Sequence, residues 1–539
     1  MANLIDITTN VLSQNTICFE TRNINVEQIP VPIQDAKFGI LNFVAVTAEE
    51  TKDEIDFVFI VDCSGSMSDK CSDGRSKIQH IIHTLKNMIL FFHDHTNAKI
   101  NVTINAFDTQ IYPIVSRTKI THENLDLIIH KISKISPRGS TNIEFALRKS
   151  AEEINNLKNL FPDNIIHHIF MTDGEATDGS KDIHLLQSIL HTDITNAFIG
   201  FGVEHDAALL NGISSLGKSA YYFIDKLESA GLVYGEILHG IIYKLLEDSE
   251  IIIENGLVYN YKTNTWVESL KIGDIVSEAN KIYNIISDNP DECKVNIKGT
   301  LSDLVILFPS TLSDPIDLTR QIYRQRTLQL LYEVNDFCNR KRTYETSHDT
   351  GILNIFIGNR DDIAFQTLED EKKNIKFKLS NLIEEMKKYM TDNNLEEDKV
   401  LKNLCDDIYI CFRTFGTKFG MMYCTARQTS QGTQRQYTAS SIGVTEDIYD
   451  ANRTIRQRNR NRAPGIPQLY RQTNAVQFYD LHDDFELPIV QHTMSDFADT
   501  PYLTPQATEV MREINNPFGG NHYDEEDEDE TYILTQKIN

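Results

Sequence analysis

Five oxygen-bearing side chains stand close together in the segment DCSGSMSD, residues 62–69, directly after the apolar run FVFIV. Two further polar residues lie far along the chain, Thr141 in RGSTNIEFAL and Asp173 in FMTDGEATDG. Hydroxyl and carboxylate oxygens are the ligands that a hard cation such as Mg²⁺ prefers. The D-x-S-x-S pattern alone would also suit a helix cap, but the three segments together favour a metal site. The predicted metal-binding residues are Asp62, Ser64, Ser66, Thr141 and Asp173.

The elements that must bring these residues together are strands of a parallel sheet. From residue 56 to about 248, short apolar runs alternate with amphipathic stretches, which indicates strands separated by helices. The expected strands cover 56–62, 98–108, 164–173, 194–202 and 220–225, and the expected helices cover 78–93, 124–133, 143–157, 182–190 and 207–216. Because ligands bind at the carboxyl ends of such strands, we expect Asp62 and Asp173 at one edge of the sheet.

The remainder of the chain shows three other patterns. Residues 1–50 and 249–312 contain short extended runs, which we interpret as one β-sandwich completed by the N-terminal strands. Residues 313–424 show helical periodicity. Residues 425–539 are rich in Gln, Thr, Ser, Arg and Asn and carry the acidic run DEEDEDE, so we predict a low-complexity, largely disordered tail.

The segment from about 56 to 248, within a predicted domain of residues 51–248, resembles the von Willebrand factor A (VWA) domain with its metal-ion-dependent adhesion site (MIDAS), in particular the intracellular eukaryotic, protist and large-DNA-virus type. The stretches RGSTNIEFALRKSAEEI, HHIFMTDGEATDG, AFIGFGVEHDAALLNGIS and YYFIDKLESAG carry the likeness beyond the D-x-S-x-S motif. The resemblance implies a Rossmann-like, doubly wound α/β fold with a predominantly parallel sheet. It also implies that Ser64, Ser66 and Thr141 bind Mg²⁺ (or Mn²⁺) directly, with Asp62 and Asp173 acting through water. The loop between Met67 and Lys77 is longer than expected for the family.

Composition excludes several functions. A net charge of −26 over 539 residues argues against a dedicated nucleic-acid binder, although residues 453–472 are basic. No apolar run approaches the ~20 residues of a membrane helix, and the N-terminus lacks the pattern of a secretory signal. Eight scattered cysteines without a C-x-x-C pair suit an intracellular, cytoplasmic protein. The motifs of nucleotide hydrolysis, zinc proteolysis and esterase chemistry are absent, so we expect no enzyme.

The sequence therefore predicts a metal-dependent scaffold for protein–protein interaction. A partner's Asp or Glu carboxylate would complete the coordination of the MIDAS metal. Two alternatives stay open. The chain could be a structural or virion assembly component of a large DNA virus, with a purely structural metal and self-association, or a non-catalytic adaptor in ubiquitin transfer.

Overall fold

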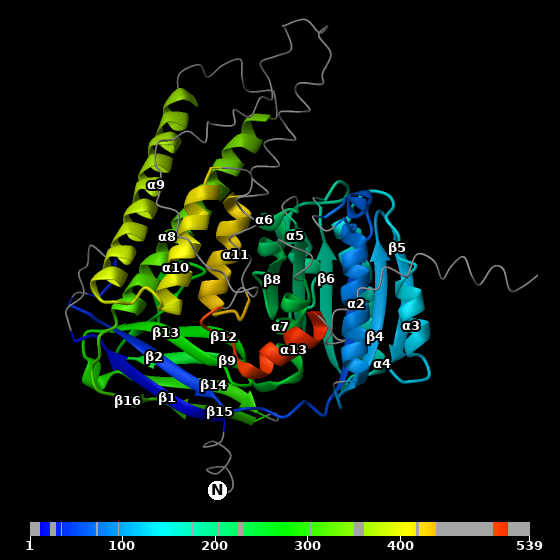
Figure 1. Cartoon of the computed structure of the whole chain (residues 1–539), viewed down its shortest axis with the longest axis horizontal. Helices are drawn as coiled ribbons and strands as arrows, with labels where there is room; N and C mark the ends of the chain where they lie inside the picture. Colours follow the sequence, from blue (N-terminus) through cyan, green and yellow to red (C-terminus); the bar gives the residue numbers. More distant parts are fainter. Residues whose placement is uncertain are drawn as a thin grey trace, which may run out of the picture.

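The chain folds into three adjoining parts, an α/β domain, a β-sandwich and a group of long helices (Figure 1). The computed structural model describes residues 11–21, 29–33, 35–71, 74–94, 96–174, 176–202, 205–224, 230–301, 304–349, 361–416, 420–437 and 500–515.

A six-stranded sheet forms the centre of the α/β domain, in the order β5-β4-β3-β6-β7-β8. Its strands are β3 (Glu54–Asp62), β4 (Lys99–Phe107), β5 (Ile111–Lys119), β6 (Ile165–Thr172), β7 (Thr195–Phe201) and β8 (Ser219–Ile224). All neighbouring pairs are parallel except β4 and β5. The five predicted strands are thus confirmed. The antiparallel edge strand β5 was not predicted, because its residues are mostly half-exposed and carry no clear alternation.

Helices cover both faces of this sheet, as expected for near-continuous apolar strands. They are α2 (Lys77–Asp94), α3 (Leu125–Ile132), α4 (Ile143–Leu160), α5 (Ile183–Ile189), α6 (Ala207–Ile213) and α7 (Ala230–Ile242). Alternate residues of β3 point to opposite faces: Phe57 and Phe59 pack with α2, α3 and α7, whereas Val58 and Ile60 pack with α4, α5 and α6. Only α7 is absent from the predicted helices.

Two sheets form the β-sandwich, and their neighbouring strands are antiparallel except for the parallel pair β1 and β16. One contains β1 (Leu12–Phe19), β2 (Lys37–Ala45), β10 (Leu257–Asn260), β11 (Thr265–Val267), β13 (Asn280–Ser287) and β16 (Thr311–Leu312). The other contains β9 (Lys244–Glu254), β12 (Ser269–Val276), β14 (Lys294–Leu301) and β15 (Leu304–Pro309). The N-terminal strands β1 and β2 lie in the same sheet as β13, which pairs with β2 over eight residues. A shared apolar core that includes Phe43, Ile251 and Ile297 joins the two sheets.

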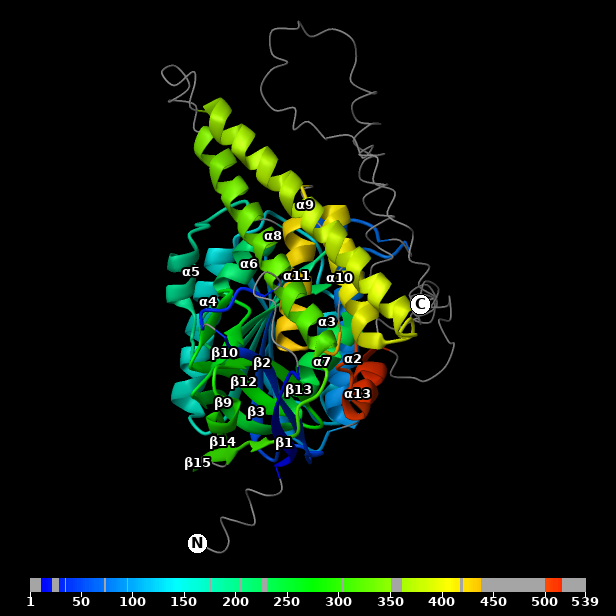
Figure 2. The same cartoon turned by 90° about the vertical axis from the view of Figure 1, so that its left-hand side faces the viewer.

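The helical part consists of α8 (Thr319–Asp349), α9 (Asp361–Asp392), α10 (Lys399–Thr414) and α11 (Gly420–Thr433). Figure 2 shows α8 and α9 running side by side away from the rest of the molecule. Helices α10 and α11 turn toward the α/β domain, where Met422 and Tyr423 join the core beneath α4 and α6.

Two pieces of the predicted tail are folded, which corrects its boundary at residue 425. Helix α11 continues to Thr433, and α13 (Pro505–Asn515) packs against α7 and α2. Both are stabilised by contacts with distant elements rather than by their own composition. The rest of the predicted tail, including the basic stretch 453–472 and the acidic run 524–530, lies outside the described residues.

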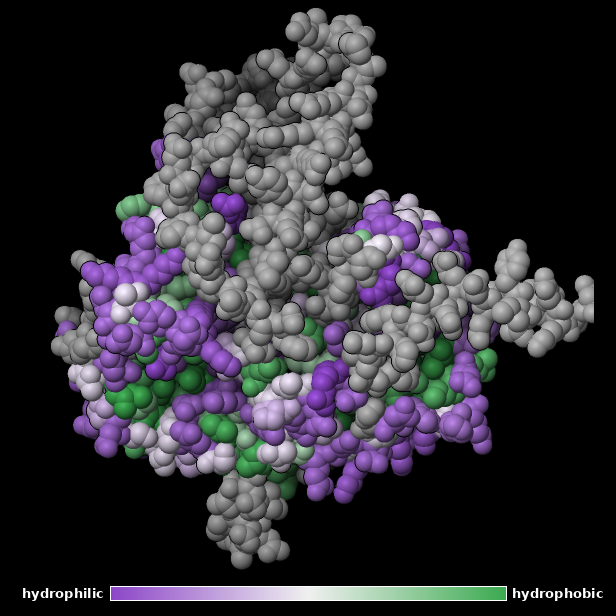
Figure 3. Space-filling model, viewed as in Figure 1, coloured by the Kyte–Doolittle hydropathy of each residue, from purple (hydrophilic) through white to green (hydrophobic). Residues whose placement is uncertain are grey.

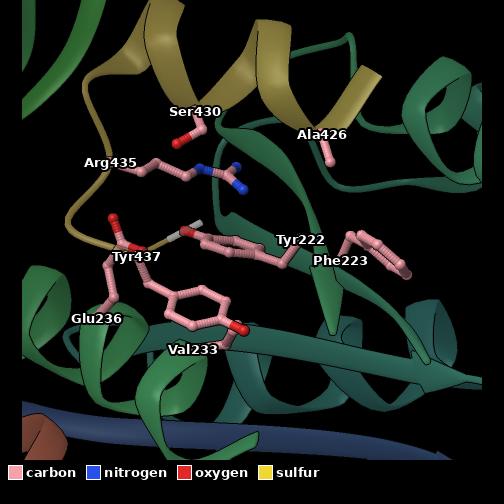
Figure 4. A pocket seen from close by; sticks show the side chains of 8 residues that line it. All are labelled: Tyr222, Phe223, Val233, Glu236, Ala426, Ser430, Arg435 and Tyr437. Atoms are coloured by element: carbon pink, nitrogen blue, oxygen red, sulfur yellow. The ribbon is translucent and has the colours of Figure 1, made fainter. Parts of the chain in front are cut away.

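Polar contacts near the end of α11 connect the three parts of the molecule, and Figure 4 shows the side of this polar joint at which Arg435 lies beside Tyr222. The Arg435 guanidinium lies 4.0 Å above the Tyr222 ring of the α/β domain and donates to the Tyr221 carbonyl oxygen at 2.5 Å. Lys281 of the sandwich donates to the carbonyl oxygens of Thr433 and Gln434. These contacts fix the α/β domain against the other two parts.

Where Figure 3 shows described residues, hydrophilic residues alternate with separate hydrophobic patches. Within the described residues, no helix is both long enough and apolar enough to span a membrane.

Candidate metal centre

Asp62 ends β3 and organises the loop that follows it. Its Oδ1 atom accepts a hydrogen bond from the Ser64 backbone N–H at 2.7 Å, and its Oδ2 atom accepts one from the Thr172 hydroxyl at 2.5 Å. Thr172 is the last residue of β6, the neighbouring parallel strand. The buried Asp62 carboxylate therefore ties the D-x-S-x-S loop to the strand that leads into Asp173.

Burial strongly affects the acidity of this carboxylate. The pKa of Asp62 is raised to about 6, mainly because burial removes the carboxylate from water. The hydrogen bonds from Ser64 and Thr172 oppose this rise, and the nearby Asp173 charge adds to it. A divalent cation at this position would favour the ionised form and reverse the effect of burial.

Ser64, Ser66 and Asp173 form a continuous line of oxygen atoms. The Ser64 and Ser66 hydroxyl oxygens lie 3.2 Å apart, and the Ser66 hydroxyl donates to Asp173 Oδ1 at 2.7 Å. Ser64 and Asp173 are buried, whereas Ser66 is half-buried at the rim. Adjacent ligands of an octahedral Mg²⁺ with bonds of about 2.0–2.1 Å are about 3 Å apart. The spacing of the two serine oxygens fits such an ion.

Thr141 reaches the same place from the loop before α4. The Gly65 N–H donates to the Gly139 carbonyl oxygen at 3.1 Å, which joins the two loops. The Thr141 N–H donates to the Thr177 hydroxyl at 2.9 Å. A Cβ atom built on Gly174 would lie 3.5 Å from Thr141 Oγ1 and 3.6 Å from Ser66 Oγ. The two hydroxyl oxygens therefore face one common space, which the missing side chain of Gly174 leaves open.

The loop that carries Thr141 depends on a close approach at Gly139. This residue has a φ of +63°, and a Cβ atom there would lie 2.4 Å from Asp108 Oδ2. Asp108 itself accepts hydrogen bonds from the Gln110 N–H and the Tyr112 hydroxyl, and its carbonyl oxygen accepts one from the Asn142 N–H. Asp108 thus shapes a turn that supports the Thr141 loop.

All five residues predicted as metal-binding lie at the carboxyl edge of the sheet, and the contacts above bring them together. Sequence reasoning missed Thr172, which orients Asp62, and Lys77, whose ammonium group donates to Asp173 Oδ2 at 2.7 Å. Thr172 directly precedes Asp173, so its place at the strand end was a usable signal. Lys77 lies eleven positions beyond Ser66, and only the folding of the intervening loop brings it back.

The model of the von Willebrand factor type A domain matches residues 56–234, from the third residue of β3 to the fifth residue of α7. Residues 56–234 form a von Willebrand factor type A domain. The chain order of its strands and helices and the sheet order β5-β4-β3-β6-β7-β8 make it the doubly wound α/β fold expected from the sequence.

Solved structures with this domain share low sequence identity with the chain. A von Willebrand factor type A protein from Catenulispora acidiphila is 13% identical, with a TM-score of 0.40, covering 61% of this chain and 81% of its own. The ArnB paralog VWA2 from Sulfolobus acidocaldarius is 14% identical, with a TM-score of 0.42, covering 74% and 94%. Proximal thread matrix protein 1 of the mussel byssus, with a zinc-occupied MIDAS motif, is 17% identical, with a TM-score of 0.29, covering 39% and 51%. The comparison with curated proteins gives no match.

Proposed function

We propose that the A domain is a non-catalytic, metal-dependent protein-binding module, in which Mg²⁺ (or Mn²⁺) is held by Ser64, Ser66 and Thr141. One observation carries the proposal: hydroxyl oxygens from two loops face a common space beside the buried Asp173 carboxylate. Bound there, the metal would supply Lewis acidity toward an anionic oxygen. The general role of von Willebrand factor type A domains in protein–protein interaction supports the same reading.

The chain's own residues would hold the ion incompletely. Asp62 has both carboxylate oxygens engaged by Ser64 and Thr172, and Asp173 has both engaged by Ser66 and Lys77. Three neutral hydroxyl groups then remain as direct ligands, fewer than the six positions of octahedral Mg²⁺. An Asp or Glu carboxylate of a partner protein would fill one of the positions left to solvent.

The other two parts of the molecule would serve as a scaffold for this module. The polar joint at Arg435 and the packing of α11 and α13 hold the A domain in one orientation. We place the protein in the cytoplasm, where its cysteines would stay reduced. All eight are free thiols in the structure.

The decisive experiment compares two serines of one loop. Tagged wild type, Ser66→Ala and Ser68→Ala are incubated with a eukaryotic cell lysate in Mg²⁺ or in EDTA, and captured proteins are identified by mass spectrometry. Ser68 is exposed and its hydroxyl donates to the Gly65 carbonyl oxygen at 2.7 Å, away from Asp173, so it serves as the matched control.

We expect partners that are captured by wild type and Ser68→Ala in Mg²⁺, and lost in EDTA or with Ser66→Ala. Mn²⁺ titration of the same three proteins gives the direct reading, with binding weakened only in Ser66→Ala. Partners that persist in EDTA would refute carboxylate bridging. That outcome would favour the second candidate, a structural or virion assembly component whose metal is purely structural.

A further inference from the structure

A lysine lies inside the candidate metal centre. Lys77 is the first residue of α2, and its Nζ atom is 2.7 Å from Asp173 Oδ2. The Lys77 side chain is 14% exposed, and the Asp173 side chain is completely buried. A second carboxylate, Asp69, lies 3.8 Å from the same nitrogen, but its side chain is 59% exposed. The main partner of the Lys77 charge is therefore the buried Asp173.

The contacts within the loop after Met67 explain how Lys77 reaches this position. The Lys77 N–H donates to the Asp69 carbonyl oxygen at 3.0 Å, and the Cys71 N–H donates to the Arg75 carbonyl oxygen at 2.8 Å. Lys70 and Ser76 form an isolated antiparallel bridge. The loop thus closes on itself, and α2 begins directly beside the short helix η1 (Gly65–Ser68) that carries Ser66.

The charges of the site favour the binding of an anion together with the metal. The ionised side chains of Asp62 and Asp173 carry two negative charges, which a divalent cation would balance. Lys77 adds one positive charge in contact with Asp173 Oδ2. With the metal bound, the centre would have a net charge of about +1, and repulsion between the two cations would weaken metal binding. An anion at the open coordination position would remove this excess.

We propose that Lys77 is the resident cation of the metal centre. It pairs with Asp173 in the metal-free protein, lowers the affinity for the metal alone, and makes the binding of metal and of an anionic ligand mutually dependent. The inference rests on the proposed metal-binding function of Ser64, Ser66 and Thr141. It adds the reason why the ligand is a carboxylate rather than a neutral group. Metal and carboxylate must strengthen each other's binding by the same factor.

The test measures Mn²⁺ affinity by calorimetric titration of the full chain, with acetate as the carboxylate probe and acetamide as its neutral counterpart. The variants are Lys77→Met and Lys77→Gln, both of which remove the charge, while the Gln amide can still donate to Asp173. Lys158→Met is the matched control, because Lys158 pairs with Asp193 at 2.6 Å elsewhere in the domain.

Without acetate, both Lys77 variants should bind Mn²⁺ about tenfold more tightly than wild type or more, and Lys158→Met should match wild type. Acetate, but not acetamide, should raise the Mn²⁺ affinity of wild type several-fold more than that of the Lys77 variants. In EDTA, Lys77→Met should melt a few degrees below wild type, because Asp173 loses its partner. Adding Asp173→Asn to Lys77→Met should restore the melting temperature.

Equal or weaker Mn²⁺ binding by both Lys77 variants would overturn the inference while leaving the metal site intact. Mn²⁺ binding by the Lys77 variants but not by wild type would support the role of Lys77 as the resident cation. It would refute the proposed metal-dependent function of the wild-type protein. Failure of every protein to bind Mn²⁺ would refute both.

Discussion

The contact between α7 and α13 gives the sharpest prediction about the fold. A Cβ atom on Gly235 would lie 2.5 Å from Met511 Cα, and one on Gly231 would lie 2.6 Å from Asn515 Cα. Both neighbours are backbone atoms, which cannot turn aside as a side chain can. Gly240, on the same helix, has only one neighbour within 4 Å of such a Cβ, Val276 Cγ1 at 3.9 Å. Gly235→Ala and Gly240→Ala therefore form a matched pair.

The expected change in stability is the balance of two opposing effects. Replacing Gly by Ala inside a helix stabilises it by roughly 0.5–1 kcal/mol. Gly240→Ala should show this gain alone. In Gly235→Ala, the methyl group forces α13 away from α7, at a cost of about 1–3 kcal/mol for an overpacked contact. The docking of α13 depends on the burial of Val510, Met511 and Ile514, so the cost falls on this helix.

Hydrogen exchange of the backbone amides in residues 505–515 is the suitable assay, because it measures local opening of α13 separately from the stability of the other parts. A cost of 1–3 kcal/mol corresponds to protection lowered by about 5- to 150-fold, since 1.4 kcal/mol is a factor of ten. Gly240→Ala should leave this protection unchanged. Wild-type protection of α13 in Gly235→Ala would refute the close backbone contact on which the reasoning depends.

Three further predictions concern the metal centre and the helical part. Gly174→Ala should keep the melting temperature but lower Mn²⁺ affinity at least tenfold, since its methyl group would make ordinary contacts in the space that the site hydroxyls face. The Mn²⁺ affinity of wild type should fall as the pH drops below about 6, because burial raises the pKa of Asp62 to about 6 and the metal needs its ionised form. Arg427→Met should cost about 3–5 kcal/mol in unfolding experiments, because it leaves the buried Asp407 without its ion pair at 3.0 Å.

Each of these has a result that would contradict it. Unchanged Mn²⁺ binding by Gly174→Ala would place the metal elsewhere. A flat affinity between pH 5 and 7 would remove Asp62 from the site. The stability of the metal-free protein depends on pH in the opposite sense. Because the pKa of Asp62 is raised in the folded protein, Asp62 stabilises the fold most below about pH 4, and this contribution is lost as the pH rises through about 6. If Arg427→Met is as stable as wild type, the prediction is wrong and Asp407 must be neutral in the variant, because removal of the Arg427 charge raises the Asp407 pKa above its value of about 7 in wild type.

Much of the A domain could be predicted because its pattern is local. Near-continuous apolar strands such as residues 56–62 can only be buried in a sheet covered on both faces, and parallel strands bring their carboxyl ends to one edge. The polar residues that follow β3 and β6 were therefore expected together. The same logic failed for α7, whose glycines disfavour a helix in isolation. Packing of α7 against the sheet and α13 compensates for that preference.

The sequence by itself determined the doubly wound sheet and the edge at which Asp62, Ser64, Ser66, Thr141 and Asp173 lie, because hydrophobic periodicity and strand direction act over short segments. Only the tertiary structure decided that Lys77 pairs with Asp173 and that α13 docks on α7. Both contacts join residues far apart in the chain, and their geometry depends on loop closure and on close backbone packing, which no local pattern records.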